Sequence, residues 1–299
     1  MKDQMIMGTL RDYPVRFYIA VTTEAVQTMN AIHETTPVAA AAAGRVLTAA
    51  GLMGAMMKNK EDLLTLTVKG DGEIGRITAV ANNAAEVKCE ILHSRTGVYF
   101  NEKRKLDVAR VVGNGTLSVI RDIGLKQSYV GQVELISGEI AEDVAYYFAK
   151  SEQTPSMVAL GVFVRKDLRV VAAGGYIIQL MPDCDEEMIS FLESKAAALP
   201  SVTSMILDGY DAEGIAKMVF GEYEYELLGQ IEPVYHCSCS EERIDKMLLA
   251  LGEEELTAIL EEGEEIEVVC HFCNTKYLVG IPRIRALLES GRNREDAEQ

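Results

Sequence analysis

Two tight cysteine pairs near the end of this 299-residue chain constrain its fold more than any other sequence feature. The pairs are Cys237-Ser238-Cys239 and Cys270-His271-Phe272-Cys273, with 30 residues between them. Four thiolates suit the tetrahedral coordination of Zn²⁺, with Zn–S of about 2.3 Å, although Cys-x-Cys is shorter than the usual structural spacing. A helical hairpin between the pairs would bring them together. The sequence therefore predicts a small module that draws much of its folding free energy from a metal.

The ligand set and the role of the metal follow less directly from the residues. His236 and His271 lie beside the pairs and are alternative ligands, but four thiolates suffice. We expect one Zn²⁺ per reduced chain, held by Cys237, Cys239, Cys270 and Cys273. Two roles stay open: a structural zinc ribbon, or a redox switch in which each pair closes as a disulfide and the metal leaves. The acidic surroundings are expected to raise the thiol pKa values, and a bound cation would hold the sulfurs as thiolates.

Charge is distributed unevenly along the chain. There are 29 basic and 46 acidic residues, which gives a net charge of −17. Residues 1–182 carry 20 basic and 19 acidic side chains, whereas residues 183–299 carry 9 and 27. This imbalance favours separate modules. It argues against nucleic acid as a partner, because duplex binding needs clustered Lys and Arg.

Residues 1–182 are predicted to form a strand-rich sheet domain with helices, of the α+β class. Apolar, β-branched runs between turn residues indicate strands, and Thr36-Pro37 before an alanine-rich run indicates the capped start of a helix. The expected strands are 14–21, 63–68, 76–80, 87–92, 98–101, 117–121, 133–135, 158–164, 168–171 and 176–180. The expected helices are 38–57 and 140–151.

Residues 183–235 are predicted to be a helical linker, and residues 236–299 a small C-terminal zinc-binding module. Pro200 separates helices 186–199 and 201–207, and Asp211 caps a third short helix that ends at Val219. A strand over 222–228 follows. Because such short helices are marginal alone, they are expected to pack on another surface. In the module we expect helices 241–251, capped by Ser240, 253–262 and 284–290, and strand 265–269 beside strand 277–279.

The other motifs have simpler interpretations. Gly70-Asp71-Gly72-Glu73-Ile74-Gly75 matches the dinucleotide-binding pattern, but a strand-like run follows it, so we interpret it as a hairpin turn. Cys89 and Cys184 stand alone and are expected to be incidental. The sequence has no nucleophile elbow, zincin motif or P-loop, so we do not expect an enzyme.

The sequence also bears on the compartment. It has no run of 18 apolar residues and no apolar stretch of the signal-peptide kind, so we expect a cytoplasmic protein without a membrane span. In that compartment a tight cysteine cluster is more often a metal or redox site than a disulfide framework.

At its cysteines the chain resembles the redox-regulated 33-kilodalton heat-shock protein family. The matching residues are His236-Cys237-Ser238-Cys239-Ser240 with Glu241-Glu242-Arg243, and Cys270-His271-Phe272-Cys273-Asn274 followed by Tyr277. Earlier stretches that resemble the family are 70–75, 113–117, 129–131, 133–156 and 173–182. The chain departs from the family at Val87-Lys88-Cys89-Glu90-Ile91, where an Arg-Gly-Tyr-Val stretch is common, so details of that surface do not transfer.

The resemblance implies an ATP-independent holdase chaperone in which the zinc module covers a client-binding surface. Oxidation is then expected to form Cys237–Cys239 and Cys270–Cys273 disulfides, to release Zn²⁺ and to unfold the linker. The active form would bind unfolding client proteins and form a homodimer. The alternative is a constitutive zinc-dependent protein-binding module with a purely structural metal.

Overall fold

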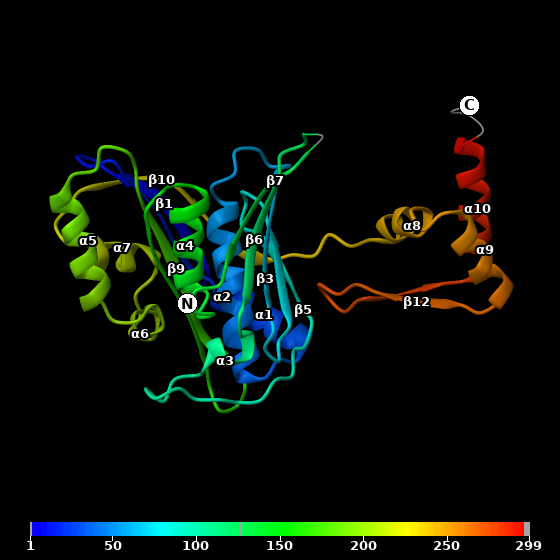
Figure 1. Ribbon diagram of the computed structural model, residues 1–299, viewed down its shortest axis with the longest axis horizontal. Helices are drawn as coiled ribbons and strands as arrows, with labels where there is room; N and C mark the ends of the chain where they lie inside the picture. Colours follow the sequence, from blue (N-terminus) through cyan, green and yellow to red (C-terminus); the bar gives the residue numbers. More distant parts are fainter. Residues whose placement is uncertain (1, 126, 296–299) are drawn as a thin grey trace. The chain divides into compact units, whose positions relative to one another are not determined.

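The computed structural model describes residues 2–125 and 127–295 (Figure 1). The chain forms two compact units, Met1–His236 and Cys237–Gln299. Both helices and sheets are present, so the expected α+β class is confirmed. Residues 183–235 belong to the first unit, and their behaviour as a separate linker stays a prediction.

The first unit is built on two sheets. Sheet A has the strand order β10-β1-β2-β9-β8 and sheet B the order β11-β5-β4-β3-β6-β7. Strand β11 runs parallel to β5, and the other pairs are antiparallel. The strands of sheet A are β1 (Gln4–Leu10), β2 (Val15–Val21), β8 (Ser156–Val164), β9 (Val170–Leu180) and β10 (Tyr225–Ile231). Those of sheet B are β3 (Leu63–Gly70), β4 (Arg76–Ala81), β5 (Glu86–Ile91), β6 (Gly115–Asp122), β7 (Tyr129–Glu134) and β11 (Val234–Tyr235).

Helix α2 (Pro37–Gly54) forms the centre of the core between the two sheets (Figure 1). Its small residues allow close packing: a Cβ on Gly44 would meet Val26 at 2.6 Å and Val162 at 2.9 Å. Within the described residues, α2 is the one helix long and apolar enough to span a membrane, and 89% of it is buried inside the unit. The helices packed beside it are α1 (Thr23–His33), α3 (Val108–Val112) and α4 (Ala141–Ser151).

The N-terminus of α2 differs from the predicted cap. Pro37 occupies the first turn as expected, but the Thr36 hydroxyl makes no capping bond. It instead lies 3.0 Å from the Thr96 hydroxyl and accepts the Thr96 N–H at 3.2 Å. Thr36 therefore ties a distant loop to the helix start.

Strand β9 corrects the prediction of two strands at 168–171 and 176–180. Strand β9 lies in the middle of sheet A between two cores, so it is buried along nearly its whole length and its sequence shows no alternation that marks its length. Gly174-Gly175, which lies between the two predicted strands, is inside β9. A Cβ on Gly174 would meet the Ala20 carbonyl oxygen at 2.4 Å, and one on Gly175 the Ala159 carbonyl oxygen at 2.6 Å. The glycines permit close strand approach.

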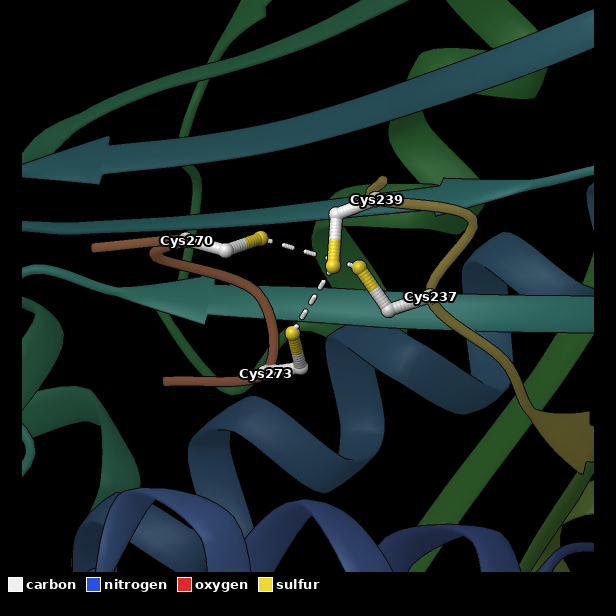
Figure 2. Close-up of side chains that lie close together, drawn as sticks. All are labelled: Cys237, Cys239, Cys270 and Cys273. Atoms are coloured by element: carbon white, nitrogen blue, oxygen red, sulfur yellow. Dashed lines mark hydrogen bonds between the residues drawn. The ribbon is translucent and has the colours of Figure 1, made fainter. Parts of the chain in front are cut away.

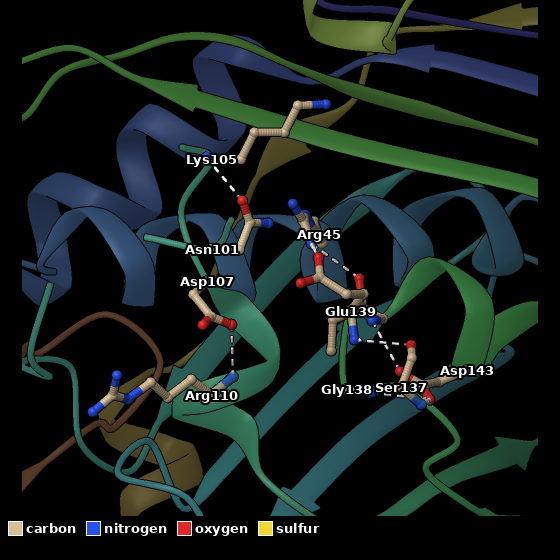
Figure 3. Close-up of polar contacts among 10 residues, drawn as sticks. Arg45, Asn101, Lys105, Asp107, Arg110, Ser137, Gly138, Glu139 and Asp143 are labelled. Carbon is tan, nitrogen blue, oxygen red and sulfur yellow. Dashed lines mark hydrogen bonds and ion pairs between the residues drawn. The ribbon is translucent and has the colours of Figure 1, made fainter. Parts of the chain in front are cut away.

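The predicted strand 98–101 is wrong. Phe100 forms only an isolated bridge with Leu106, and its side chain is 63% exposed. The apolar residues of this segment therefore do not mark a strand paired in a sheet. Asn101 holds the loop by accepting the Lys105 N–H at 3.0 Å (Figure 3). Strand β1 and helices α1 and α3 were not predicted. The Gly70–Gly75 segment is the expected hairpin turn, closed by the Gly70 N–H on the Gly75 carbonyl at 2.8 Å.

A buried carboxylate shapes the start of α4. Asp143 is fully buried and accepts backbone N–H groups of four residues, Ile136, Ser137, Gly138 and Ile140 (Figure 3). These bonds hold Ile140 at φ 73°, a left-handed conformation that disfavours β-branched residues. Arg45 of α2 forms an ion pair with Glu139 in the same turn. This network fixes the path of the chain from β7 into α4.

Three helices cover the outer face of sheet A: α5 (Glu186–Ala198), α6 (Val202–Leu207) and α7 (Ala212–Phe220). They match the predicted linker helices, and Asp211 caps α7 through the Gly214 N–H at 2.8 Å as expected. Their apolar sides form a second core with β2 and β9. In this core the ring centroids of Phe220 and Phe17 are 4.9 Å apart. The predicted strand 222–228 is found three residues later, as β10.

The second unit is small. Its elements are α8 (Glu241–Leu249), α9 (Glu253–Glu262), β12 (Ile266–Val269), β13 (Lys276–Val279) and α10 (Ile281–Glu295). The predicted pairing of two strands is confirmed by the β12–β13 hairpin. Ser240 caps α8 by accepting the Arg243 N–H at 3.3 Å. The core of the second unit consists of Ile244, Leu248, Leu256, Val279, Ile284, Leu287 and Leu288.

The fold predicts that the packing of α5, α6 and α7 on sheet A depends strongly on Phe220. Phe220→Ala empties a site that is fully buried and should cost about 3–5 kcal/mol of stability. We expect hydrogen exchange to increase mainly in α5, α6 and α7. Leu207→Ala, at a position 52% exposed in the same segment, serves as the control. Equal exchange in the two variants would contradict the packing described.

Candidate metal centre

The four cysteines of the two pairs meet at one point of the second unit (Figure 2). Their Sγ atoms all lie within 4.8 Å of one another. The Cys237 and Cys270 sulfurs are 3.7 Å apart, and those of Cys239 and Cys273 are 3.3 Å apart. All four are free thiols and half-buried. Within the described part of the chain, neither His236 nor His271 belongs to this group.

The second pair sits in a turn between β12 and β13. The Cys270 N–H donates to the Thr275 carbonyl at 2.9 Å, and the Asn274 N–H donates to the Cys270 carbonyl at 2.7 Å. Asn274 adopts φ 55°, which asparagine tolerates better than most residues. The hairpin thus folds the Cys-x-x-Cys segment into a knuckle that presents both sulfurs on one side.

The first pair lies in the short segment between Tyr235 and the start of α8. The Ser240 cap fixes where that helix begins, directly after Cys239. Arg243, one turn into α8, reaches back and donates to the Ser238 hydroxyl at 2.5 Å. Both contacts hold the Cys-x-Cys segment at the helix N-terminus, so α8 positions the first pair as the hairpin positions the second.

Two hydroxyl groups contact the cluster, and the sequence did not point to this role for either. The Tyr277 hydroxyl donates to the Cys239 sulfur at 3.1 Å, and the Thr275 hydroxyl lies 3.1 Å from the Cys273 sulfur. Thr275 and Tyr277 are two residues apart, at the entry to β13, so they lie on the same side of the strand. The positions of Thr275 and Tyr277, two and four residues after Cys273, are the sequence feature that could have indicated these contacts.

The thiol pKa values of the cluster are shifted in opposite directions. Burial raises the pKa of Cys237 to about 12 and also raises that of Cys270. Burial is the main cause of both increases in pKa, whereas we had expected the acidic surroundings to cause them. At Cys273 burial also acts to raise the pKa, but hydrogen bonds from Thr275 and the neighbouring sulfurs lower it to about 7.

The donor set fits Zn²⁺. Four sulfurs around a tetrahedral ion at about 2.3 Å would be about 3.8 Å apart, close to the separations found here. Thiolates are soft ligands that suit Zn²⁺, and a closed set of four is typical of sites without an open catalytic position. The cluster can therefore hold a metal through its four cysteines.

The two remaining cysteines lie in the first unit. Cys89 is fully buried in β5, and burial raises its pKa far above that of a reactive thiol. Cys184 is partly buried against the second core, and burial raises its pKa as well. Neither belongs to the four-sulfur group.

Comparison with known proteins gives a match over nearly the whole chain. The model of the Hsp33 protein family matches residues 3–280. The 33 kDa chaperonin of Clostridium botulinum strain Eklund 17B is 45% identical over 291 residues, covering 97% of this chain and 99% of that protein. The 33 kDa chaperonin of Thermoanaerobacter sp. strain X514 is 43% identical over 289 residues, covering 96% of this chain and 98% of that protein.

A solved structure agrees with these sequence matches. The crystal structure of the 33 kDa chaperonin of Thermotoga maritima, a heat shock protein 33 homologue, is similar with a TM-score of 0.88. It is 35% identical, and the match covers 98% of this chain and all of that one.

The geometry predicts one Zn²⁺ per reduced chain, held by all four cysteines. Each single Cys→Ser variant at positions 237, 239, 270 and 273 should lose tight binding, because each removes one of four thiolates. Metal analysis after competition with a chelator measures this. His236→Ala and His271→Ala are the controls and should keep the metal. Tight binding retained by Cys239→Ser but lost by His236→Ala would overturn the four-thiolate assignment.

Proposed function

Because the chain belongs to the Hsp33 family, we propose that it is a redox-regulated, ATP-independent holdase chaperone whose switch is the four-cysteine cluster. The observation that carries this proposal is the convergence of four free thiols within 4.8 Å, in a chain that matches the family over 3–280. The family is one of non-enzymatic chaperones, and no chemistry on a substrate is needed for such a role. Client proteins in the course of unfolding are the proposed partners.

In the reduced state the four cysteines would hold one Zn²⁺. The ion, when bound, neutralises charge among the thiolates and links the two pairs. The second unit has a core of only a few apolar side chains, so its stability should depend strongly on that link. Loss of the metal then removes this stabilisation from the folded state by mass action.

Oxidation would convert each cysteine pair into a disulfide. For one pair, two thiolates and one hydrogen peroxide take up two protons, and the products are one disulfide and two waters. We propose Cys237–Cys239 and Cys270–Cys273 as the pairs, following the family resemblance. The two close sulfur contacts, Cys237 with Cys270 and Cys239 with Cys273, join different pairs, but all four sulfurs lie within 4.8 Å, so closure within each pair requires only local movement. A disulfide sulfur is a poor Zn²⁺ ligand, so the metal site is lost.

The chain itself couples the cysteines to the helices on sheet A. Strand β11 ends at Tyr235, two residues before Cys237, and the His236 N–H donates to the Val87 carbonyl at 2.8 Å. The Tyr235 hydroxyl donates to the Cys89 carbonyl at 3.1 Å. Residues 183–235 are thus held at one end by β9 and at the other by this short strand. If the second unit unfolds, β11 and the pairing of β10 with β1 would remain as the anchors at that end.

The surface under α5, α6 and α7 is the proposed client site. Those helices bury apolar residues of β2 and β9, including Phe17, Ile19 and Ile178. If the helices leave, a contiguous apolar area becomes available to unfolding chains. We also propose a homodimer in the oxidised form and a cytoplasmic location.

Peroxide-triggered activity is the first test of this function. The oxidised protein should suppress aggregation of a heat-unfolding client, and the reduced, zinc-loaded protein should not. Cys89→Ser/Cys184→Ser is the matched control and should still be activated, because neither thiol belongs to the cluster. Equal suppression by reduced and oxidised protein would favour the constitutive binding module with a structural metal.

Hydrogen exchange tests the coupling between the cysteines and residues 183–235. After oxidation, α5, α6 and α7 should lose protection before the strands of sheet A, because short helices depend on packing for stability. The reduced protein provides the reference. If oxidation loosens only residues 235–279 and leaves 186–219 as protected as before, the coupling is wrong.

A further inference from the structure

Each cysteine pair has one sulfur in contact with a side-chain hydroxyl. Tyr277 donates to Cys239 in the first pair, and Thr275 contacts Cys273 in the second. Both hydroxyls come from the start of β13, Thr275 directly before it and Tyr277 within it. The two sulfurs they contact are also adjacent, at 3.3 Å. Backbone N–H groups of the two turns also bond to the sulfurs of Cys237, Cys270 and Cys273.

These hydroxyls affect the reactivity of the sulfurs they contact. A hydrogen bond to a thiolate stabilises its charge, which lowers its electron density and its nucleophilicity toward an electrophile. When the sulfur is a thiolate, the hydroxyl must be the donor, since only it carries a proton. A bond of this kind also restricts the sulfur's position, as donors outside a metal's ligand set commonly do.

We propose that Tyr277 and Thr275 are positioning residues that slow the oxidation of Cys239 and Cys273 and so set the oxidant level at which the cluster responds. This inference rests on the proposed redox function. In the step concerned, a thiolate attacks hydrogen peroxide and, with one proton, gives a sulfenic acid and water. The partner thiolate then attacks that sulfur and, with a second proton, gives the disulfide and a second water.

A purely structural role for the two side chains makes a different prediction. If they only stabilise the β12–β13 hairpin, their loss loosens the whole knuckle and every cysteine becomes more reactive. If they act through hydrogen bonds to individual sulfurs, each variant changes one cysteine. The two roles therefore separate when the four cysteines are measured individually.

The test uses the zinc-loaded full chain and three variants that each remove one hydroxyl. Tyr277→Phe removes the donor to Cys239, and Thr275→Val removes the contact to Cys273. Thr257→Val is the matched control in the same unit, because the Thr257 hydroxyl bonds to the Glu253 carbonyl of its own helix. The measurement is the rate of alkylation by iodoacetamide at each cysteine, resolved by mass spectrometry, followed by the rate of disulfide formation in peroxide.

We expect Tyr277→Phe to react about threefold faster at Cys239, and Thr275→Val about threefold faster at Cys273, because nucleophilicity rises only fractionally with basicity. Thr257→Val should match the parent chain. An equal increase at all four cysteines, or none at the contacted one, would overturn the inference. If the parent cluster forms no disulfide in peroxide, the proposed function fails instead.

Cobalt provides a second readout that does not depend on activity. In the Co²⁺-loaded chain, the sulfur-to-metal charge-transfer band reports the electron density on the ligating sulfurs. Tyr277→Phe should shift this band to lower energy, whereas Thr257→Val should leave it in place. An unchanged band in Tyr277→Phe would show that the hydroxyl does not tune Cys239.

Discussion

Four sulfur atoms within 4.8 Å of one another are the constraint on which the second unit depends. As thiolates the four sulfurs repel one another, and as half-buried thiols they must lose their protons before they can bind a metal. A soft divalent cation bound among them offsets the repulsion and keeps the sulfurs deprotonated. The buried apolar residues described in this unit's core are few and provide little independent stability, so under the proposed function the state of the sulfurs would decide whether the unit stays folded.

The first unit has a larger hydrophobic core than the second. Its core surrounds α2, and Asp143, Arg45 and the hairpin turn at 70–75 hold its loops through many local bonds. None of these contacts involves the cluster cysteines. The difference in core size between the units fits the proposed switch, in which the second unit would unfold while the first stays folded.

The sequence predicted the parts of the structure that rest on local chemistry. The Cys-x-Cys and Cys-x-x-Cys spacing, the caps at Asp211 and Ser240 and the β12–β13 pairing all depend on residues close in sequence. The errors came where distant contacts decide. β9 is buried on both faces and its glycines serve strand approach, which no alternation reveals. Thr36 bonds to Thr96 rather than to its own helix. Tyr277 reaches a sulfur 38 positions earlier in the chain, and only the folded hairpin shows that contact.

The architecture of sheet A connects the proposed client binding with the proposed dimer. A sheet that is apolar on both faces needs two covers, and here one cover is the main core and the other is the set of short helices α5, α6 and α7. The main core contains none of the four cluster cysteines, so under the proposed function its face would stay covered after oxidation. The outer face, with Phe17, Ile19 and Ile178, would lose its only other cover if those helices unfold. An apolar area of that kind does not remain in contact with water, because its burial is strongly favourable. It must be covered by an unfolding client or by a second copy of the chain, so both forms of association would arise from the same exposed face.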